Sequence, residues 1–168
     1  MPRPTLPKET RADRRARLAH INLLIAASRF TDDMDQACRA AGLTMQQYTV
    51  LWVLCFSDKA DQGVPMGVIA DGLVNRASDT TRMVDRMVQA GLADRRPSPT
   101  DRRVVLVRAT AAGRRAFGAA VPAVMAFHRH QWANLTTTEI DTLHHLIAKT
   151  LWGSDEKNTT TIDNQEAS

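Results

Sequence analysis

Arginine dominates one stretch of the chain, at a spacing that suits contact with a polyanion. Residues 76–115 carry ten bases, all of them arginine, and four acids, which gives a net charge of +6. Arg82 and Arg86 lie one turn apart on the polar side of a segment whose apolar residues recur at helical spacing. A guanidinium group in such a place can donate two hydrogen bonds to the edge of a guanine, or clamp a phosphate.

A second set of arginines follows this helix, in a pattern that predicts a β-hairpin. Gly91 ends the helix, and the run from Asp94 to Val107 predicts a strand, a tight turn and a second strand. A helix fits the major groove of duplex DNA, and a hairpin tipped with arginine reaches the backbone or the minor groove. The sequence therefore predicts a winged helix-turn-helix, with the hairpin as its wing, that binds double-stranded DNA.

Polar residues near the start of the helix add further candidate contacts. The hydroxyl groups of Ser78 and Thr81 can reach phosphates or base edges. Asp79 either accepts a hydrogen bond from N4 of a cytosine or orients Arg82 through an i,i+3 pair. We favour the orienting role, because phosphates repel a free carboxylate.

The wing arginines have two possible roles. Arg95 and Arg96 are assigned either to phosphate contacts or to stabilising the base of the wing. The alternative for the whole set is that these arginines pair within the molecule, with Asp94 and Asp101. The predicted DNA-binding residues are Ser78, Asp79, Thr81, Arg82, Arg86, Arg95, Arg96, Asp101, Arg102 and Arg103.

Several helices must position these side chains, and capping signals locate some of them. Thr44 with Gln47, and Thr136 with Glu139, have the spacing of a capping box, and Thr110 is a further N-cap candidate. The predicted helices cover about residues 12–41, 45–56, 67–73, 77–90, 111–132 and 137–151, and residues 64–66 form either a short strand or the start of the third helix.

The middle of the chain is too small to bury its own apolar faces, so the flanking helices must pack on it, on each other and on a second copy. We expect a mainly α fold with a small β-hairpin wing, in which the N- and C-terminal helices form a dimerisation body. The ends differ in charge: residues 1–17 carry six bases and two acids, and residues 153–168 carry one base and four acids. The predicted units are a flexible basic arm (1–11), a helical dimerisation region (12–42 and 111–152), a winged helix-turn-helix DNA-binding domain (43–110) and a disordered acidic tail (153–168).

Three motifs occur together between Leu43 and Phe117. They are Thr81-Arg82-Met83-Val84-Asp85-Arg86-Met87 with Gly91-Leu92 after it, Asp101-Arg102-Arg103, and Thr110-x-x-Gly113-Arg114. In this combination they resemble the recognition helix, the wing and the strand-to-helix corner of the MarR family of bacterial transcription regulators.

The resemblance implies a homodimer whose two winged modules bind a palindromic operator, with repression as the expected outcome. It also implies that Arg103 or Arg102 enters the minor groove while Asp101 braces the tip of the wing. Members of the family bind small phenolic or aromatic compounds between the dimer body and the winged module. Here the candidate ligand-binding residues are His20, Phe30, Tyr48, Trp52 and Phe127, for each of which a place in the core is the alternative.

Other chemistry has less support. Cys38 and Cys55 lie in apolar helical settings without C-x-x-C spacing, so we expect buried, reduced thiols, and a cysteine-based redox sensor is an alternative. Adjacent or alternate histidines on one helix point to different sides, so no metal site and no cofactor are expected. The chain lacks a Gly-rich phosphate loop and a nucleophile elbow, so an enzyme is not expected.

No apolar run is long enough to span a membrane, and we expect a cytoplasmic, nucleoid-associated protein. The function predicted from the sequence is a DNA-binding transcription regulator that acts as a homodimer and is released by a small effector. The alternatives are a redox-sensing regulator and a sequence-tolerant DNA-binding architectural protein.

Overall fold

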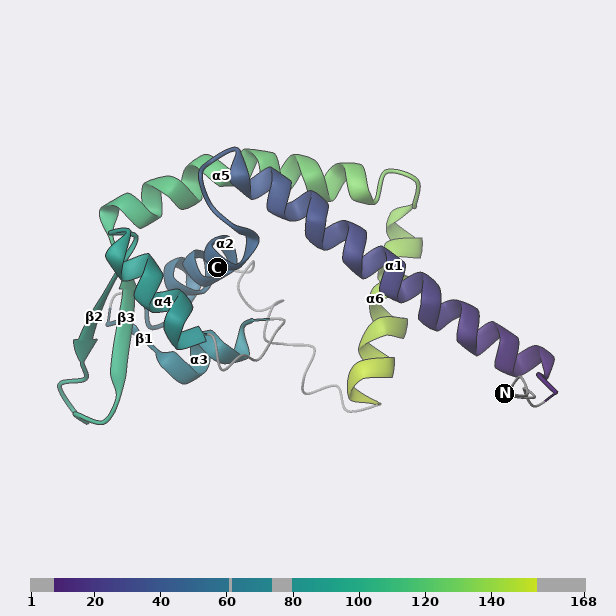
Figure 1. Ribbon diagram of the computed structural model, residues 1–168, viewed down its shortest axis with the longest axis horizontal. Coiled ribbons are helices and arrows are strands. Elements are labelled where there is room, and N and C mark those ends of the chain that lie inside the picture. Colours follow the sequence, from purple (N-terminus) through teal and green to yellow (C-terminus); the bar gives the residue numbers. More distant parts are fainter. Residues whose placement is uncertain (1–7, 61, 74–79, 154–168) are drawn as a thin grey trace, which may run out of the picture.

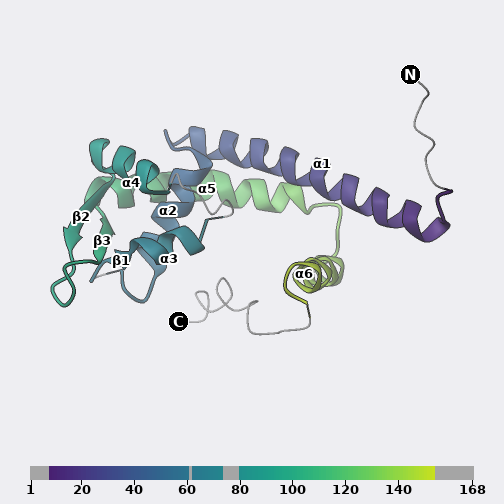
Figure 2. The ribbon, with the colours of Figure 1, turned by 60° about the horizontal axis from the view of Figure 1, so that its bottom comes forward.

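Two long helices lie side by side and connect the two ends of the molecule (Figure 1). They are α1 (Arg11–Arg39) and α5 (Ala111–Gln131), seen here in a computed structural model that describes residues 8–60, 62–73 and 80–153. At one end of the pair lies a small lobe, residues 43–110, in which all the described strands are found (Figure 1). At the other end α6 (Thr137–Trp152) follows α5 and lies away from the lobe (Figure 2).

The lobe is built around α2 (Met45–Phe56), an apolar helix of which five residues are buried. Val50 and Leu51 of this helix are fully enclosed, and they belong to the same core cluster as Ile69 and Val107. The remaining elements of the lobe are β1 (Val64–Pro65), α3 (Met66–Asp71), α4 (Thr80–Gln89), β2 (Ala93–Pro97) and β3 (Val105–Ala109). The predicted fold class, mainly helical with a small β-hairpin, is confirmed.

The strands form one antiparallel sheet in the order β1-β3-β2. Strands β2 and β3 are the predicted hairpin, paired from Ala93 opposite Ala109 to Pro97 opposite Val105. The third strand is only two residues long, and Val64 lies opposite Val107. Pro65 can occupy this strand because β1 lies at the edge of the sheet, where a missing N–H breaks no ladder. Both predictions for residues 64–66 are therefore correct in part, since Met66 begins α3.

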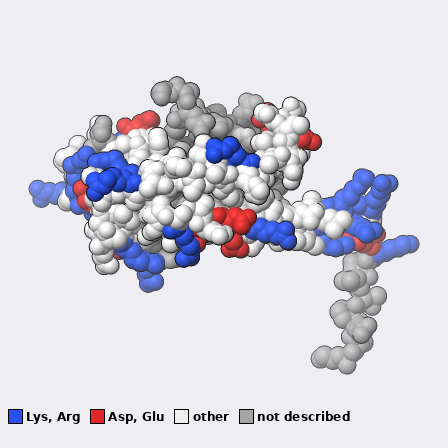
Figure 3. All heavy atoms as spheres, turned by 90° about the horizontal axis from the view of Figure 1, so that it is seen from above, with Lys and Arg blue, Asp and Glu red and all other residues white. Residues whose placement is uncertain are grey.

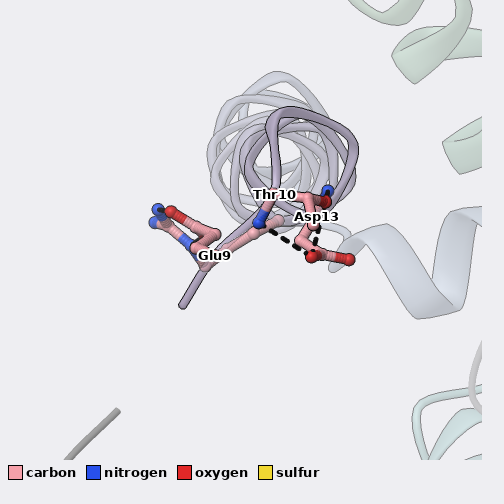
Figure 4. A network of polar contacts seen from close by, with 4 residues as sticks. Glu9, Thr10 and Asp13 are labelled. Atoms are coloured by element: carbon pink, nitrogen blue, oxygen red, sulfur yellow. Dashed lines mark hydrogen bonds and ion pairs between the residues drawn. The ribbon is translucent and has the colours of Figure 1, made fainter. Parts of the chain in front are cut away.

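Helix α1 begins at Arg11, the last residue of the segment predicted to be a flexible arm. Thr10 accepts a hydrogen bond from the backbone N–H of Asp13, and the Asp13 carboxylate accepts from the Thr10 backbone at 3.0 Å (Figure 4). The Asp13 carboxylate also accepts from the Thr10 hydroxyl at 2.6 Å, and this bond, with the one from the Thr10 backbone, lowers the pKa of Asp13. The hydrogen bond and ion pair with Arg17 lower the pKa of Glu9. The predicted capping boxes at Thr44 and Thr136 form in the same way.

Helix α4 is amphipathic, as its sequence predicts. Thr80, Val84 and Met87 are buried, and Met83 and Val88 pack against the core from the sides. The helix was expected to begin near residue 77, but residues 74–79 lie outside the described part of the chain. Its C-terminal end is followed by Gly91 with φ +71°, the left-handed conformation expected of a residue that ends a helix.

Helices α1, α5 and α6 form a second part of the molecule, called here the helical body. Helix α5 contributes Phe117, Ala120 and Val124 to the core, but α1 has one buried residue, Cys38, and α6 has none. No helix in the described ranges is long and apolar enough to cross a membrane.

Val84→Ala tests how strongly the core holds α4. Because Val84 is fully buried, losing two methyl groups and leaving a cavity should cost about 2 kcal/mol of unfolding free energy. The matched control is Val68→Ala on α3, where the side chain is 42% exposed and the cost should stay below about 0.5 kcal/mol. Urea titration measures both, and equal losses would contradict this packing.

Candidate nucleic-acid interface

The outward side of α4 carries the predicted contacts to bases. Thr81, Arg82 and Arg86 are exposed, while the opposite side of the helix is anchored in the core. The Nε of Arg86 donates to the Arg82 carbonyl oxygen at 3.4 Å, so its stem runs back along the helix. Ser78 and Asp79, also predicted to contact DNA, lie outside the described residues.

The tip of the wing is closed by a side chain that the sequence analysis did not single out. Ser98 is buried, and its hydroxyl oxygen accepts from the backbone N–H groups of Thr100 and Asp101 at 3.3 and 3.4 Å. The Asp101 carboxylate accepts from the backbone N–H of Arg103 at 2.9 Å. The sequence signal for such a turn is a serine whose hydroxyl can accept from the backbone N–H groups two and three residues later. The arrangement gives Asp101 the bracing role that the resemblance implies.

Arg102 and Arg103 project from this closed tip. Both are exposed, and within the described ranges neither guanidinium group forms a salt bridge. The alternative, that they pair with Asp94 or Asp101, therefore has no support in the described chain. Two cations on a braced turn remain available to a polyanion.

Arg95 lies at the base of the wing and contacts α4 instead of solvent. Its Nη1 donates to the Asp85 carboxylate, and its Nη2 donates to the Thr81 carbonyl oxygen at 3.0 Å. The side chain is 25% exposed, and its buried Nε has no hydrogen-bond partner among the described residues. Of the two roles predicted for Arg95, these contacts favour stabilising the wing base, and they tie β2 to the recognition helix.

Arg96 makes a similar internal contact on the other side of the sheet. Its Nη2 donates to the Gln62 carbonyl oxygen at 2.7 Å, which links β2 to the segment before β1. The residue is exposed, so the guanidinium keeps donors that face solvent. Arg96 is therefore suited to both predicted roles, a structural link and a phosphate contact.

Basic side chains gather at two ends of the molecule, over the lobe and at the beginning of α1 (Figure 3). The exposed arginines of the lobe include Arg82 and Arg86 of α4 and Arg102 and Arg103 of the wing. The Arg95 contacts hold these two elements together. A shallow hollow of about 250 Å³ lies between the start of α2 and α4. Its lining residues are Thr44, Gln46, Gln47, Met83 and Arg86, none of which is aromatic.

The five candidate ligand residues do not form one group. Tyr48 is buried and stacks on Phe117 at 5.0 Å, and Phe56 links Phe117 to Trp52 through ring contacts of 5.8 Å. Phe30 instead packs against Trp132, and Phe127 against its neighbour His128. His20 is exposed on α1. Only Tyr48 and Trp52 therefore share an aromatic cluster, which lies between α2 and α5.

The cysteines are poorly placed for redox chemistry. Burial, with a contribution from the Asp35 carboxylate, raises the pKa of Cys38 to about 11. Burial also raises the pKa of Cys55, although Arg114 opposes the shift. In the described ranges no three His, Cys, Asp or Glu side chains are close enough to hold a metal ion together.

Thiol reactivity tests the interpretation of Cys38. A pKa of about 11 instead of 9.0 reduces the thiolate fraction near neutral pH about a hundredfold, so iodoacetamide should modify folded Cys38 correspondingly slowly. The rate should rise as the pH approaches the pKa, and protein unfolded in urea should react at the ordinary rate. Peptide mass spectrometry measures the rates, and rapid modification of folded Cys38 near neutral pH would reinstate the redox alternative.

A double-mutant cycle tests the contact between the wing and α4. Alanine at Asp85, at Arg95 and at both should give a coupling energy of about 1 kcal/mol in urea unfolding. The control is the pair of Asp35 and Arg39, in which the arginine side chain is 70% exposed and solvent screens the attraction. Its coupling should be below about 0.5 kcal/mol. Equal couplings in the two cycles would mean that the Arg95 contact does not stabilise the lobe.

Comparison with known proteins relates this geometry to a family. The sequence model of the MarR family matches residues 41–104, which span the lobe up to the wing tip. The transcriptional repressor IacR of Pseudomonas putida is 25% identical over 119 residues, which are 71% of this chain and 69% of IacR. The multiple antibiotic resistance protein MarR of Escherichia coli is 39% identical over 72 residues, 42% of this chain and 50% of MarR.

Solved structures extend the likeness beyond the lobe. A mutant of E. coli MarR, complexed with operator DNA, has a TM-score of 0.71 at 24% identity and covers 85% of this chain and 99% of its own. CouR of Rhodococcus jostii, bound to p-coumaroyl-CoA, has a TM-score of 0.67 at 25% identity, and the match covers 80% of this chain and 92% of CouR. The lobe, whose helix and wing expose arginine, therefore matches the MarR family of winged helix DNA-binding transcription regulators over residues 41–104, and the described chain shares the fold of these proteins.

Proposed function

We propose that the protein represses transcription by binding a pseudo-palindromic operator as a homodimer, and that a small aromatic effector releases it. The observation that carries the proposal is the pairing of two exposed basic elements. Arg82 of α4 and Arg103 of the wing tip stand on elements that Arg95 fastens together. A recognition helix and a wing in fixed relation can enter adjacent grooves at the same time.

The homodimer is supported by apolar side chains that a single chain leaves in water. On α1, Leu18, Ile21, Leu24 and Ile25 are between 38% and 57% exposed. On α6, Leu146 and Leu151 are 54% and 62% exposed. Exposed apolar residues concentrated on the helical body are typical of a protein–protein interface. A second copy of the same body would cover them and place two lobes symmetrically about one axis.

Such a symmetric pair of lobes suits an operator with two related half-sites. Winged modules related by a two-fold axis contact half-sites about ten base pairs apart, one turn of the duplex. Repression is supported by the relative IacR, which is a transcriptional repressor.

The effector proposal places the ligand beside the aromatic cluster of Tyr48, Trp52, Phe56 and Phe117. Trp52 is half-buried and Phe56 is 48% exposed, so part of this aromatic surface is open to a planar molecule. The relative CouR is bound to p-coumaroyl-CoA, which carries a phenolic ring. A ligand between α2 and α5 would bias the dimer towards an arrangement of lobes that fits the operator less well.

The experiment that tests the proposal is selection of random duplexes by the purified protein at two salt concentrations. A two-fold symmetric motif is the expected result, because each lobe reads the same bases. Binding without a motif that collapses as salt rises would leave only electrostatic affinity for DNA, as in the architectural alternative.

Two arginine variants separate base reading from backbone contact. Arg82→Ala should weaken binding by about 1–3 kcal/mol and relax base preference within each half-site. Arg103→Ala should weaken binding to all duplexes and lower the slope of log K against log salt by about 1. Arg29→Ala, an exposed arginine on α1, is the charge-matched control. If Arg103→Ala behaves like this control, the wing does not contact DNA.

A further inference from the structure

Gly113 lies at a joint where three elements meet without room for a side chain. It is the third residue of α5, and an added Cβ would lie 2.0 Å from the Leu92 carbonyl oxygen. The same Cβ would lie 3.1 Å from Cδ2 of Leu51 on α2. The backbone of α5 therefore rests directly on the backbone of the corner between α4 and β2.

Hydrogen bonds fasten this joint on both sides. The Thr110 hydroxyl donates to the Gly91 carbonyl oxygen at 2.6 Å, and the Thr110 N–H donates to the Leu92 carbonyl oxygen at 3.1 Å. The N–H of Leu92 in turn donates to the Met87 carbonyl oxygen at 2.9 Å, inside the last turn of α4. The end of the recognition helix thus cannot move relative to the first turn of α5 without breaking these bonds.

From this joint α5 runs out of the lobe and along α1 into the helical body (Figure 1). When the helical bodies of two protomers pair rigidly, this contact in each protomer sets the distance between the two recognition helices. We propose that Gly113 is a specificity-determining position, at which the contact with Leu92 sets the spacing of half-sites that the protein accepts. The inference rests on the proposed homodimer and its two half-sites.

The contact is expected to affect spacing and not base preference within a half-site. Gly113 is buried behind α4, whereas Arg82 is exposed. A Cβ at position 113 would lie 2.0 Å from the Leu92 carbonyl oxygen, whereas real Cβ contacts are essentially never shorter than 3.0 Å. The distance between these two atoms must therefore increase by at least 1.0 Å. The obstacle is a backbone oxygen, so α4 must shift relative to α5, and the shift occurs in both protomers.

The test is duplex selection from a library with a variable spacer between half-sites. Gly113→Ala should reduce the preference for the wild-type spacer over spacers one base pair longer or shorter by roughly tenfold. The matched control is Gly118→Ala on the same helix, where an added Cβ has no atom within 4 Å and the spacer profile should be unchanged.

A milder pair of variants decides the matter if Gly113→Ala does not fold. Thr110→Val removes the hydroxyl that bonds Gly91 while keeping the shape of the side chain, and should broaden the accepted spacers. Thr110→Ser keeps the hydroxyl and should retain the wild-type profile.

The outcomes separate this inference from the function on which it rests. If the wild-type protein selects no paired half-sites, the proposed function fails. If it selects them and the Gly113→Ala and Thr110→Val variants both keep the wild-type spacer profile, the inference is overturned. A change in base preference within the half-sites at unchanged spacing would overturn it as well.

Discussion

The geometry of the lobe depends on one ion pair, between Arg95 of β2 and Asp85 of α4. The pair forms among the arginines of the lobe. Arg95 is turned away from solvent by it, and the contact holds the wing and α4, which carry the exposed arginines, in a fixed relation. The wing is also held by the pairing of β3 with β1 and by the contact of Arg96 with Gln62, and the ion pair adds a side-chain link to the recognition helix. Arg95 also donates to the Thr81 carbonyl oxygen, which extends the link along the helix. An arginine whose guanidinium faces the protein can therefore position the exposed arginines of the wing and of α4 relative to one another.

Local patterns in the sequence predicted the individual helices and the hairpin well. The buried side of α4, the capping boxes of α2 and α6, and the hairpin all follow from periodicity and from hydroxyl residues at N-caps. Contacts between distant residues were not predictable in this way. Arg95 meets Asp85 only because β2 packs beside α4, and Gly113 meets Leu92 only because α5 begins beside the end of α4. The candidate ligand residues were dispersed for the same reason, since helical spacing does not say which helices meet.

The two parts of the molecule differ in how they hold their residues. The lobe holds most of the buried core, which residues of α5 and the end of α1 complete, and it matches the family model over almost its whole length. The helical body exposes most of its apolar side chains, and α6 buries none. In the proposed homodimer the lobe contacts DNA, and the helical body sets the geometry in which the two lobes bind together.

The composition of the basic surface has a consequence for control of the protein. Between residues 76 and 115 every base is arginine, and neither lysine nor histidine occurs. Guanidinium groups stay protonated at any pH that a cell experiences, so the charge of this surface does not change with acidity. Lysine acetylation, the common way to neutralise such a surface, has no acceptor there. In the proposed homodimer, control of DNA binding would therefore act through the arrangement of the two lobes and not through a change in the number of basic charges on this surface.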